Sequence, residues 1–162
     1  MIEIEHEDTF VNTFILFVQT AQAVLKSADA FLYRKANLSV IKLIVLQVLE
    51  RHNGVMTPSE IAEWTQTERH NITALVQRMK RDGLITAERS NIDKRTVNIY
   101  LTDKGRQVLE QTIPVAREIK DLMMSSTTEE EAIQMAERLK VLRKNAFDIL
   151  GGLTYTVRKW PE

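Results

Sequence analysis

The residues Thr57-Pro58-Ser59-Glu60-Ile61-Ala62, together with residues 68–84, are the most informative about the fold. Thr57 and Glu60 have the spacing of a capping box, and Pro58 occupies the first helical position, so a helix is predicted to begin at about Pro58. Thr65-Gln66-Thr67-Glu68 offers a second capping box a few residues later. This short spacing predicts a short helix, a tight turn and a second helix, which is the helix-turn-helix arrangement.

The second helix has one apolar side and one polar side. Its apolar residues recur at i, i+3, i+4 and i+7, so they form a single stripe that faces a core. They are Ile72, Leu75, Val76 and Met79. The opposite side consists of His70, Thr73, Ala74, Gln77 and Arg81, flanked by Asn71 and Arg78. An ordinary amphipathic surface helix has the same stripe, but a polar, partly cationic face also suits a helix that reads base edges and contacts phosphates.

A hairpin with a cationic tip follows this helix. Gly83 is placed to end the helix in the left-handed conformation. Residues 84–89 are predicted to form one strand, and Val97, Ile99 and Leu101 alternate with polar residues in the period of a half-buried strand. The loop between the strands holds Lys94 and Arg95. The expected fold is therefore mainly α with a small β-wing, a winged helix-turn-helix that binds double-stranded DNA.

These segments resemble the MarR family of bacterial transcription regulators. The resemblance spans about residues 38–110. It is carried by Ile61-Ala62, residues 71–85, Arg89, Asp93-Lys94-Arg95 and Leu101-Thr102-Asp103-Lys104-Gly105-Arg106. The most specific part is Asp93 and Arg95 in the wing, followed by the Leu-Thr-x-x-Gly start of the next helix. Gln66 stands where such proteins often have a turn glycine, and Glu68 where a small cap residue is usual.

The resemblance implies a homodimeric transcription regulator, most often a repressor in this family. Its two recognition helices enter successive major grooves of a palindromic operator, while the wings reach the flanking minor grooves. The resemblance assigns insertion into the minor groove to Arg95 and support of the wing to Asp93. It also implies relief of DNA binding by a small-molecule effector of unspecified identity. The expected DNA-binding residues are Arg69, His70, Asn71, Thr73, Gln77, Arg78, Arg89, Asp93, Lys94 and Arg95.

Positive charge is concentrated in the segment expected to bind DNA. The chain of 162 residues has 22 Lys and Arg and 22 Asp and Glu, so its net charge is zero. Residues 67–106 hold nine Lys or Arg against five acids, whereas residues 1–31 hold five acids against one lysine. A neutral chain with a basic segment suits a regulator whose DNA-facing surface is confined.

Both ends of the chain are predicted to be helices with broad apolar faces. The N-terminal series repeats at alternating spacings of four and three and comprises Phe10, Phe14, Phe17, Ala21, Val24, Ala28 and Phe31. The C-terminal series comprises Ala132, Met135, Leu139, Leu142, Ala146 and Ile149. These helices either pack on each other or join the same pair from a second copy, and a two-fold partner matches a palindromic site. We expect residues 1–36 and 107–162 to form a helical dimerisation region, and residues 37–106 to form the winged helix-turn-helix domain.

Further helices are expected at residues 38–52 and 102–124, the latter bent at Pro114. Thr128-Glu129-Glu130-Glu131 is a capping box for the last helix, and Gly151-Gly152 is expected to close it. His52 is interpreted as a partner of a helix C-terminus, and Trp64 as a core residue rather than the wall of a ligand pocket.

The sequence shows no motif typical of an enzyme. The absence of cysteine excludes disulfides and thiol-based sensing. The three histidines are scattered without metal-ligand spacing, and no glycine loop for phosphate is visible, so no enzyme, metal or cofactor is expected. The acidic N-terminus is unlike a secretory signal and no long apolar run occurs, so we expect a cytoplasmic protein outside the membrane. The main alternative function is a winged helix that binds an acidic protein partner without binding DNA.

Overall fold

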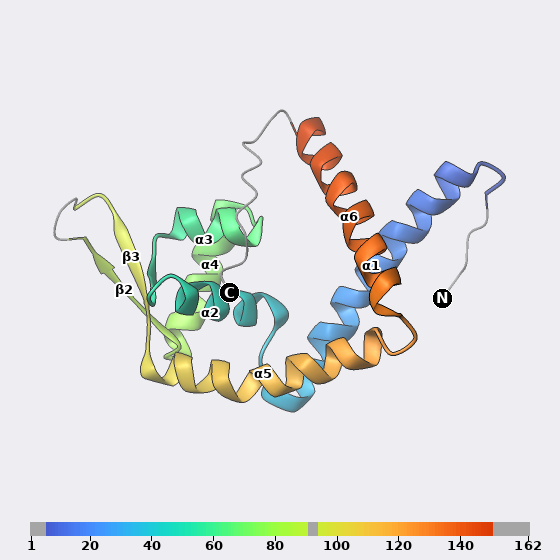
Figure 1. Cartoon of the computed structure of the whole chain (residues 1–162). Coiled ribbons are helices and arrows are strands. Elements are labelled where there is room, and N and C mark those ends of the chain that lie inside the picture. The colour runs from blue at the N-terminus through green and yellow to red at the C-terminus, as the bar shows by residue number, and fades with distance from the viewer. Residues whose placement is uncertain (1–5, 91–93, 151–162) are drawn as a thin grey trace. The chain divides into compact units, whose positions relative to one another are not determined.

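The computed structural model describes residues 6–90 and 94–150 and consists of helices with one small antiparallel sheet. The elements, in chain order, are α1 (Thr9–Ala36), α2 (Val40–Arg51), β1 (Val55–Met56), α3 (Pro58–Thr65), α4 (Arg69–Arg81), β2 (Ile85–Arg89), β3 (Val97–Leu101), α5 (Asp103–Met123) and α6 (Glu129–Ile149) (Figure 1). The expected fold class, mainly α with a small β-wing around a helix-turn-helix, is confirmed. The chain divides into two compact units, residues 1–119 and residues 120–162.

One hydrophobic core holds the first unit together. Its side chains come from α1 to α4, from the sheet and from α5. The least exposed include Leu32, Leu46, Leu49, Ile61, Ile72, Met79, Ile85 and Ile99. All four residues of the apolar stripe predicted for α4 are buried. Such burial stabilises the fold by roughly 1.5–3 kcal/mol per large apolar side chain, so α4 is fixed along its whole inner side.

The α2 segment departs from the prediction at its start. The helix begins at Val40 rather than at residue 38, because Ser39 is extended and serves as its N-cap. Leu38 is buried as expected, although it lies before the helix. The backbone N–H of Val40 donates to the Asp29 carboxylate on α1, at 2.7 Å. A side chain from another helix therefore supplies the acceptor that Ser39 does not.

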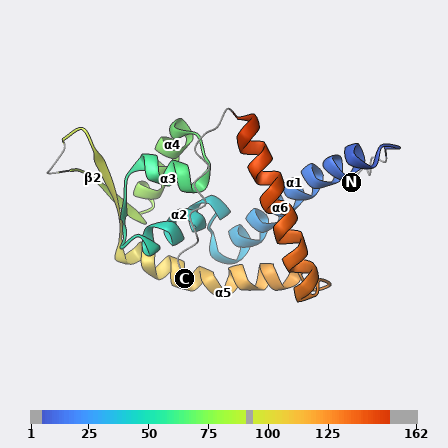
Figure 2. The same cartoon turned by 45° about the horizontal axis from the view of Figure 1, so that its top comes forward.

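The sheet has the strand order β1-β3-β2, and both pairings are antiparallel. In the hairpin, Ile85 pairs with Leu101 and Arg89 with Val97. Ile99 and Leu101 are buried as predicted, whereas Val97 is partly exposed because it lies toward the tip. Figure 2 shows the hairpin extending away from the helices of the same unit. The sequence did not predict β1, because two residues are too few to show a periodicity.

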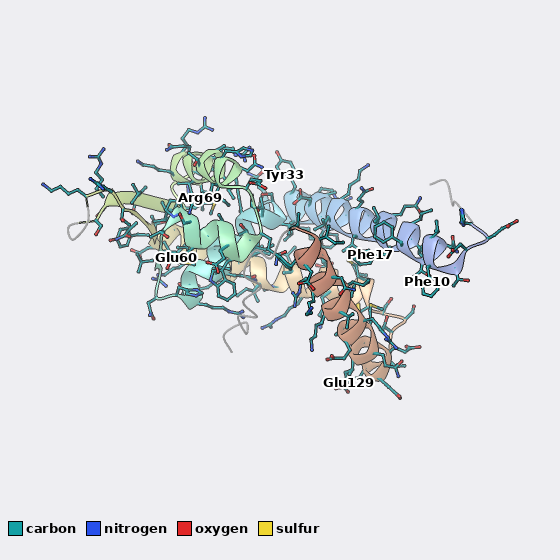
Figure 3. All side chains as sticks on the ribbon, turned by 90° about the horizontal axis from the view of Figure 1, so that it is seen from above. Phe10, Phe17, Tyr33, Glu60, Arg69 and Glu129 are labelled. Carbon is teal, nitrogen blue, oxygen red and sulfur yellow. The ribbon has the colours of Figure 1, made fainter. Side chains whose placement is uncertain are left out.

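The helix α1 is buried only toward its C-terminal end. Leu32 is 2% exposed, and Ala28 and Phe31 pack partly against the core. The N-terminal part of the predicted stripe is open to solvent, with Phe10 87% and Phe14 64% exposed. Figure 3 shows Phe10 and Phe17 on this helix.

The second unit holds the end of α5 and the whole of α6. The predicted capping box is present: Thr128 Oγ1 accepts from the N–H of Glu131, whose carboxylate accepts from the N–H of Thr128. The backbone N–H and the hydroxyl of Thr128 both donate to the Glu131 carboxylate and lower its pKa, since they favour the charged form. No residue of α6 is buried, and its predicted apolar series includes the exposed Met135, Leu139, Leu142 and Ile149. Gly151 and Gly152 lie outside the described residues.

Candidate nucleic-acid interface

The turn between α3 and α4 is closed by backbone hydrogen bonds. The Thr57 and Glu60 capping box starts α3 as predicted. At the other end, the N–H of Thr67 donates to Ala62 O at 3.0 Å, and the N–H of Gln66 donates to Glu63 O. Gln66 has φ 51°, the left-handed conformation that glycine adopts with least strain. The turn therefore keeps its tight geometry with glutamine at the usual glycine position.

The second predicted capping box is wrong. Thr65 is the last residue of α3, and its hydroxyl donates back to Ile61 O at 2.8 Å. The N-cap of α4 is Glu68, whose side chain makes no capping hydrogen bond. Its backbone carbonyl starts the helix by accepting from the N–H groups of Asn71 and Ile72. The Thr-x-x-Glu spacing is present in the sequence, but its threonine, Thr65, belongs to the last turn of α3 and is bonded there.

The outward face of α4 carries the predicted reading residues. All six are exposed: Arg69, His70, Asn71, Thr73, Gln77 and Arg78. Figure 3 marks Arg69 on this helix. The Thr73 hydroxyl donates to Arg69 O at 3.1 Å, which leaves its methyl group and oxygen lone pairs for a partner. The only exposed apolar residue of α4 is Ala74, so this face offers hydrogen-bonding groups and cations.

The C-terminal end of α4 is anchored at several points. Gly83 has φ +73° and Leu84 N–H donates to Met79 O, so the helix ends at a left-handed glycine as predicted. Lys42 Nζ on α2 lies 2.7 Å from the Asp82 carboxylate. Lys104 Nζ on α5 donates to the backbone carbonyl of Asp82 at 2.6 Å. Two neighbouring helices therefore hold the same helix end.

Thr102 and Gly105 are positioning residues that give the Leu-Thr-x-x-Gly motif a physical meaning. The Thr102 hydroxyl lies 2.8 Å from Gly83 O and 3.0 Å from Leu84 O, and it accepts from the N–H of Gly105. A side-chain carbon at Gly105 would lie 2.2 Å from Leu84 O. The first turn of α5 therefore packs directly on the turn between α4 and β2. The sequence showed the motif but not its contacts, and it gave no role to Lys42.

The wing places the remaining predicted residues away from α4. Arg89 is exposed at the end of β2, and Lys94 and Arg95 are exposed in the turn before β3. The ladder continues one pair beyond the strands, because the N–H of Ser90 donates to Thr96 O at 2.8 Å. This hydrogen bond therefore joins the two strands of the wing at the start of the loop between them. Asp93 lies outside the described residues.

The other candidate residues have structural surroundings. His52 is the C-cap of α2, and its Nδ1 atom lies 2.7 Å from Val48 O. This contact agrees with the prediction that His52 interacts with a helix C-terminus. Its ring meets Trp64 edge to face, with the ring centres 5.0 Å apart, and Trp64 packs partly against the core. Within residues 6–90 and 94–150, no cluster of three or more His, Cys, Asp or Glu side chains could hold a metal ion. In the same residues, no helix has the length and apolarity to span a membrane.

The amino-acid sequence is similar to a known protein family and to proteins of known function. The model of the MarR family matches residues 36–96. Over 121 residues the chain is 30% identical to the HTH-type transcriptional repressor MdtR of Bacillus subtilis (strain 168), a match that covers 75% of this chain and 74% of MdtR. The chain belongs to the MarR family. This MarR protein is accordingly grouped with DNA-binding transcription regulators rather than with enzymes.

Solved structures share the fold of this MarR chain. The organohalide-sensing regulator RdhR-CbdbA1625, in its 2,4-dichlorophenol-bound form, superposes with a TM-score of 0.83 at 24% identity and covers 100% of this chain and 99% of its own. Its ligand-free form has a TM-score of 0.79 at 26% identity, with 98% of each chain covered. Sco3205 of Streptomyces coelicolor, a MarR family regulator solved in complex with DNA, has a TM-score of 0.77 at 19% identity and covers 99% of this chain and 98% of its own.

Proposed function

We propose that this protein is a repressor that binds a palindromic operator as a homodimer and leaves it when a small ligand binds. The observation that carries the proposal is the outward face of α4. Apart from Ala74, its exposed side chains are donors, acceptors and cations, while the four residues of its apolar stripe are buried. A rigid helix with such a face fits the major groove, where base edges present distinct patterns of donors and acceptors.

The wing supplies the second proposed contact. Arg89, Lys94 and Arg95 are exposed cations on a hairpin that extends beyond the helices. Arginine suits a narrow minor groove because its guanidinium is weakly hydrated and the groove has a strongly negative potential. Asp93 is proposed to support this loop, as the family resemblance implies.

The homodimer is supported by the exposed apolar residues of α1 and α6. Phe10, Phe14 and Leu25 on α1, and Ile133 and Ile149 on α6, are each more than half exposed in the single chain. Exposed apolar surface of this extent is typical of an interface between proteins. A second copy related by a two-fold axis would bury it and present two recognition helices to a palindromic site.

The ligand-dependent part of the proposal is supported by one protein of the same fold and by a pocket in this chain. RdhR-CbdbA1625, which shares the fold, is described as organohalide-sensing and has been solved with 2,4-dichlorophenol bound. In the present chain a pocket of about 350 Å³ lies between the end of α1 and α5. It is lined by Tyr33, Arg34, Lys35, Ala36, Asn37, Val108, Gln111 and Thr112. This mixture of an aromatic ring, cations and polar groups suits a small anionic aromatic effector.

Selection of bound fragments from random duplex DNA tests the function directly. We expect a palindromic consensus, since two identical helices read two half-sites. Gln77→Ala should change the preferred base at one position of each half-site and cost about 1–3 kcal/mol there, because glutamine pairs with adenine in the major groove. Gln107→Ala, at an exposed glutamine on α5, is the matched control and should leave the consensus unchanged.

The alternative function, a module that binds an acidic protein, predicts a different outcome. No duplex sequence would then be enriched, and affinity for DNA would depend on salt but not on sequence. The polar outward face of α4 favours the DNA-binding function, because surfaces that bind proteins usually expose apolar residues. Equal weakening of every sequence by Gln77→Ala would show that this residue reads no base.

A further inference from the structure

The start of α4 differs from the start of every other helix in the described residues. Each of the others has a side-chain oxygen that accepts a hydrogen bond from its first free N–H groups. The acceptors are Asp8 for α1, Asp29 for α2, Thr57 for α3, Thr102 for α5 and Thr128 for α6. Glu68, at the start of α4, caps nothing. The exception is the helix whose outward face is proposed to meet DNA.

Glu68 is a poor capping residue for α4. Serine, threonine, aspartate and asparagine are the side chains that cap a helix well, because their oxygen reaches the free N–H groups directly. The Glu68 carboxylate is exposed and forms no hydrogen bond or ion pair with any residue that the structure describes. Its charge interacts favourably with the dipole of α4, but it satisfies none of the free N–H groups. A helix start that departs from the usual capping residues is a candidate for a functional role.

The chemistry of the carboxylate limits what it can contact on DNA. Phosphates repel it, so a backbone contact is excluded, and the adjacent Arg69 and His70 are better suited to that task. The first residues of a recognition helix lie nearest to the base edges. In the major groove, the cytosine amino group has an acceptor on one side only, O6 of the paired guanine. The adenine amino group lies between two acceptors, its own N7 and O4 of the paired thymine, and both repel a carboxylate.

We propose that Glu68 is a specificity-determining residue that reads one cytosine in each half-site by accepting a hydrogen bond from its N4 amino group. The inference rests on the proposed function, since it requires that α4 lies in the major groove. It adds a reader at the helix start to the predicted residues of the outward face. It also gives a reason for the uncapped start, because a side chain bound to its own helix cannot reach a base.

The test compares wild-type protein with Glu68→Gln and Glu68→Ala. Binding is measured to the selected operator with each of the four base pairs placed in turn at every half-site position. Wild-type protein should prefer cytosine at one position about tenfold. Glu68→Gln should move that preference to adenine, which an amide contacts through two hydrogen bonds, and Glu68→Ala should abolish it. Glu88→Gln removes one exposed carboxylate from β2 and should leave the preference intact.

The outcomes separate the inference from the proposed function. If wild-type protein selects no consensus, the proposed function itself fails. If a consensus is found but both Glu68 variants keep the wild-type preference at every position, only the role of Glu68 is overturned. A uniform change in affinity, or a loss of thermal stability with unchanged base preference, also overturns it, because Glu68 would then act only through its charge or on the helix dipole.

Discussion

Two neighbouring cations in the wing are expected to act differently at the scale of single residues. Lys94 is a point charge suited to phosphate, so Lys94→Ala should weaken binding about equally for all sequences and reduce the salt slope by about one unit. Arg95 is proposed to insert into the minor groove, so Arg95→Ala should also remove the preference for A·T pairs that flank the half-sites. The measurement is affinity over a range of salt for sites with A·T or G·C flanks.

Arg138→Ala serves as the control for this comparison, since it removes an exposed arginine from α6. It should change neither the affinity nor the flank preference. Asp93→Ala should resemble a weaker Arg95→Ala, because the resemblance gives Asp93 a supporting role. If Arg95→Ala retains both wild-type affinity and flank preference, the wing makes no DNA contact, and binding to a protein partner becomes the better interpretation of its charge.

At the scale of elements, the packing of α5 on the end of α4 controls the placement of the recognition helix. Gly105→Ala tests this contact, because two effects on stability oppose each other. Helix propensity favours alanine by about 1 kcal/mol. A side-chain carbon 2.2 Å from Leu84 O and 2.6 Å from Leu101 Cδ1 forces the elements apart, and overpacking of this kind costs about 1–3 kcal/mol. We expect net destabilisation, because the nearest atom belongs to the backbone.

Urea unfolding of Gly105→Ala measures the balance. Gly83→Ala is a useful comparison, because its added carbon has only ordinary contacts, with Lys104 Cδ at 3.6 Å, while its φ of +73° disfavours alanine. Both variants should unfold at lower urea than wild-type protein, one through contact and the other through conformation. A Gly105→Ala protein that is more stable than wild type would show that α5 is free to move off the end of α4.

At the scale of the whole molecule, the exposed apolar side of α1 predicts self-association. Sedimentation at micromolar concentration should give about twice the chain mass of 18.7 kDa. Phe14→Glu places a charge on this side, so it should shift the protein toward monomer and weaken binding to a full palindrome more than to a half-site. Ser59→Glu adds the same group at an exposed position of α3, outside the predicted dimerisation region, and should leave the mass unchanged. A wild-type monomer that binds the palindrome tightly would contradict the proposed dimer.

The assignment of residues 1–36 and 107–162 to dimerisation, and of residues 37–106 to DNA binding, stays a prediction that this experiment tests. The compact units of the structure divide at a different point, between Ile119 and Lys120. The predicted division separates the residues by function, whereas the compact units are separated by packing within one chain.

Features whose interacting residues are close in the chain could be predicted from the sequence alone. The capping boxes at Thr57 and Thr128 join residues three positions apart, and the buried stripe of α4 repeats within eight residues. The left-handed end of α4 needed only Gly83, and the wing hairpin needed only alternation on both sides of a polar loop. Local hydrogen bonds and periodic burial leave a readable pattern, because the geometry of helix and strand fixes the spacing.

Contacts between segments that are distant in the chain could not be predicted and are known from the folded structure. The pairing of β1 with β3, the Asp29 acceptor for α2, and the hold of Lys42 and Thr102 on the end of α4 join residues that are far apart in the sequence. The same holds for Glu68, since a sequence match to a capping box cannot show that α3 already uses Thr65. Whether a polar side chain is engaged depends on every neighbour that packing brings to it. The exposed Glu68 carboxylate is therefore a property of the fold rather than of the local sequence.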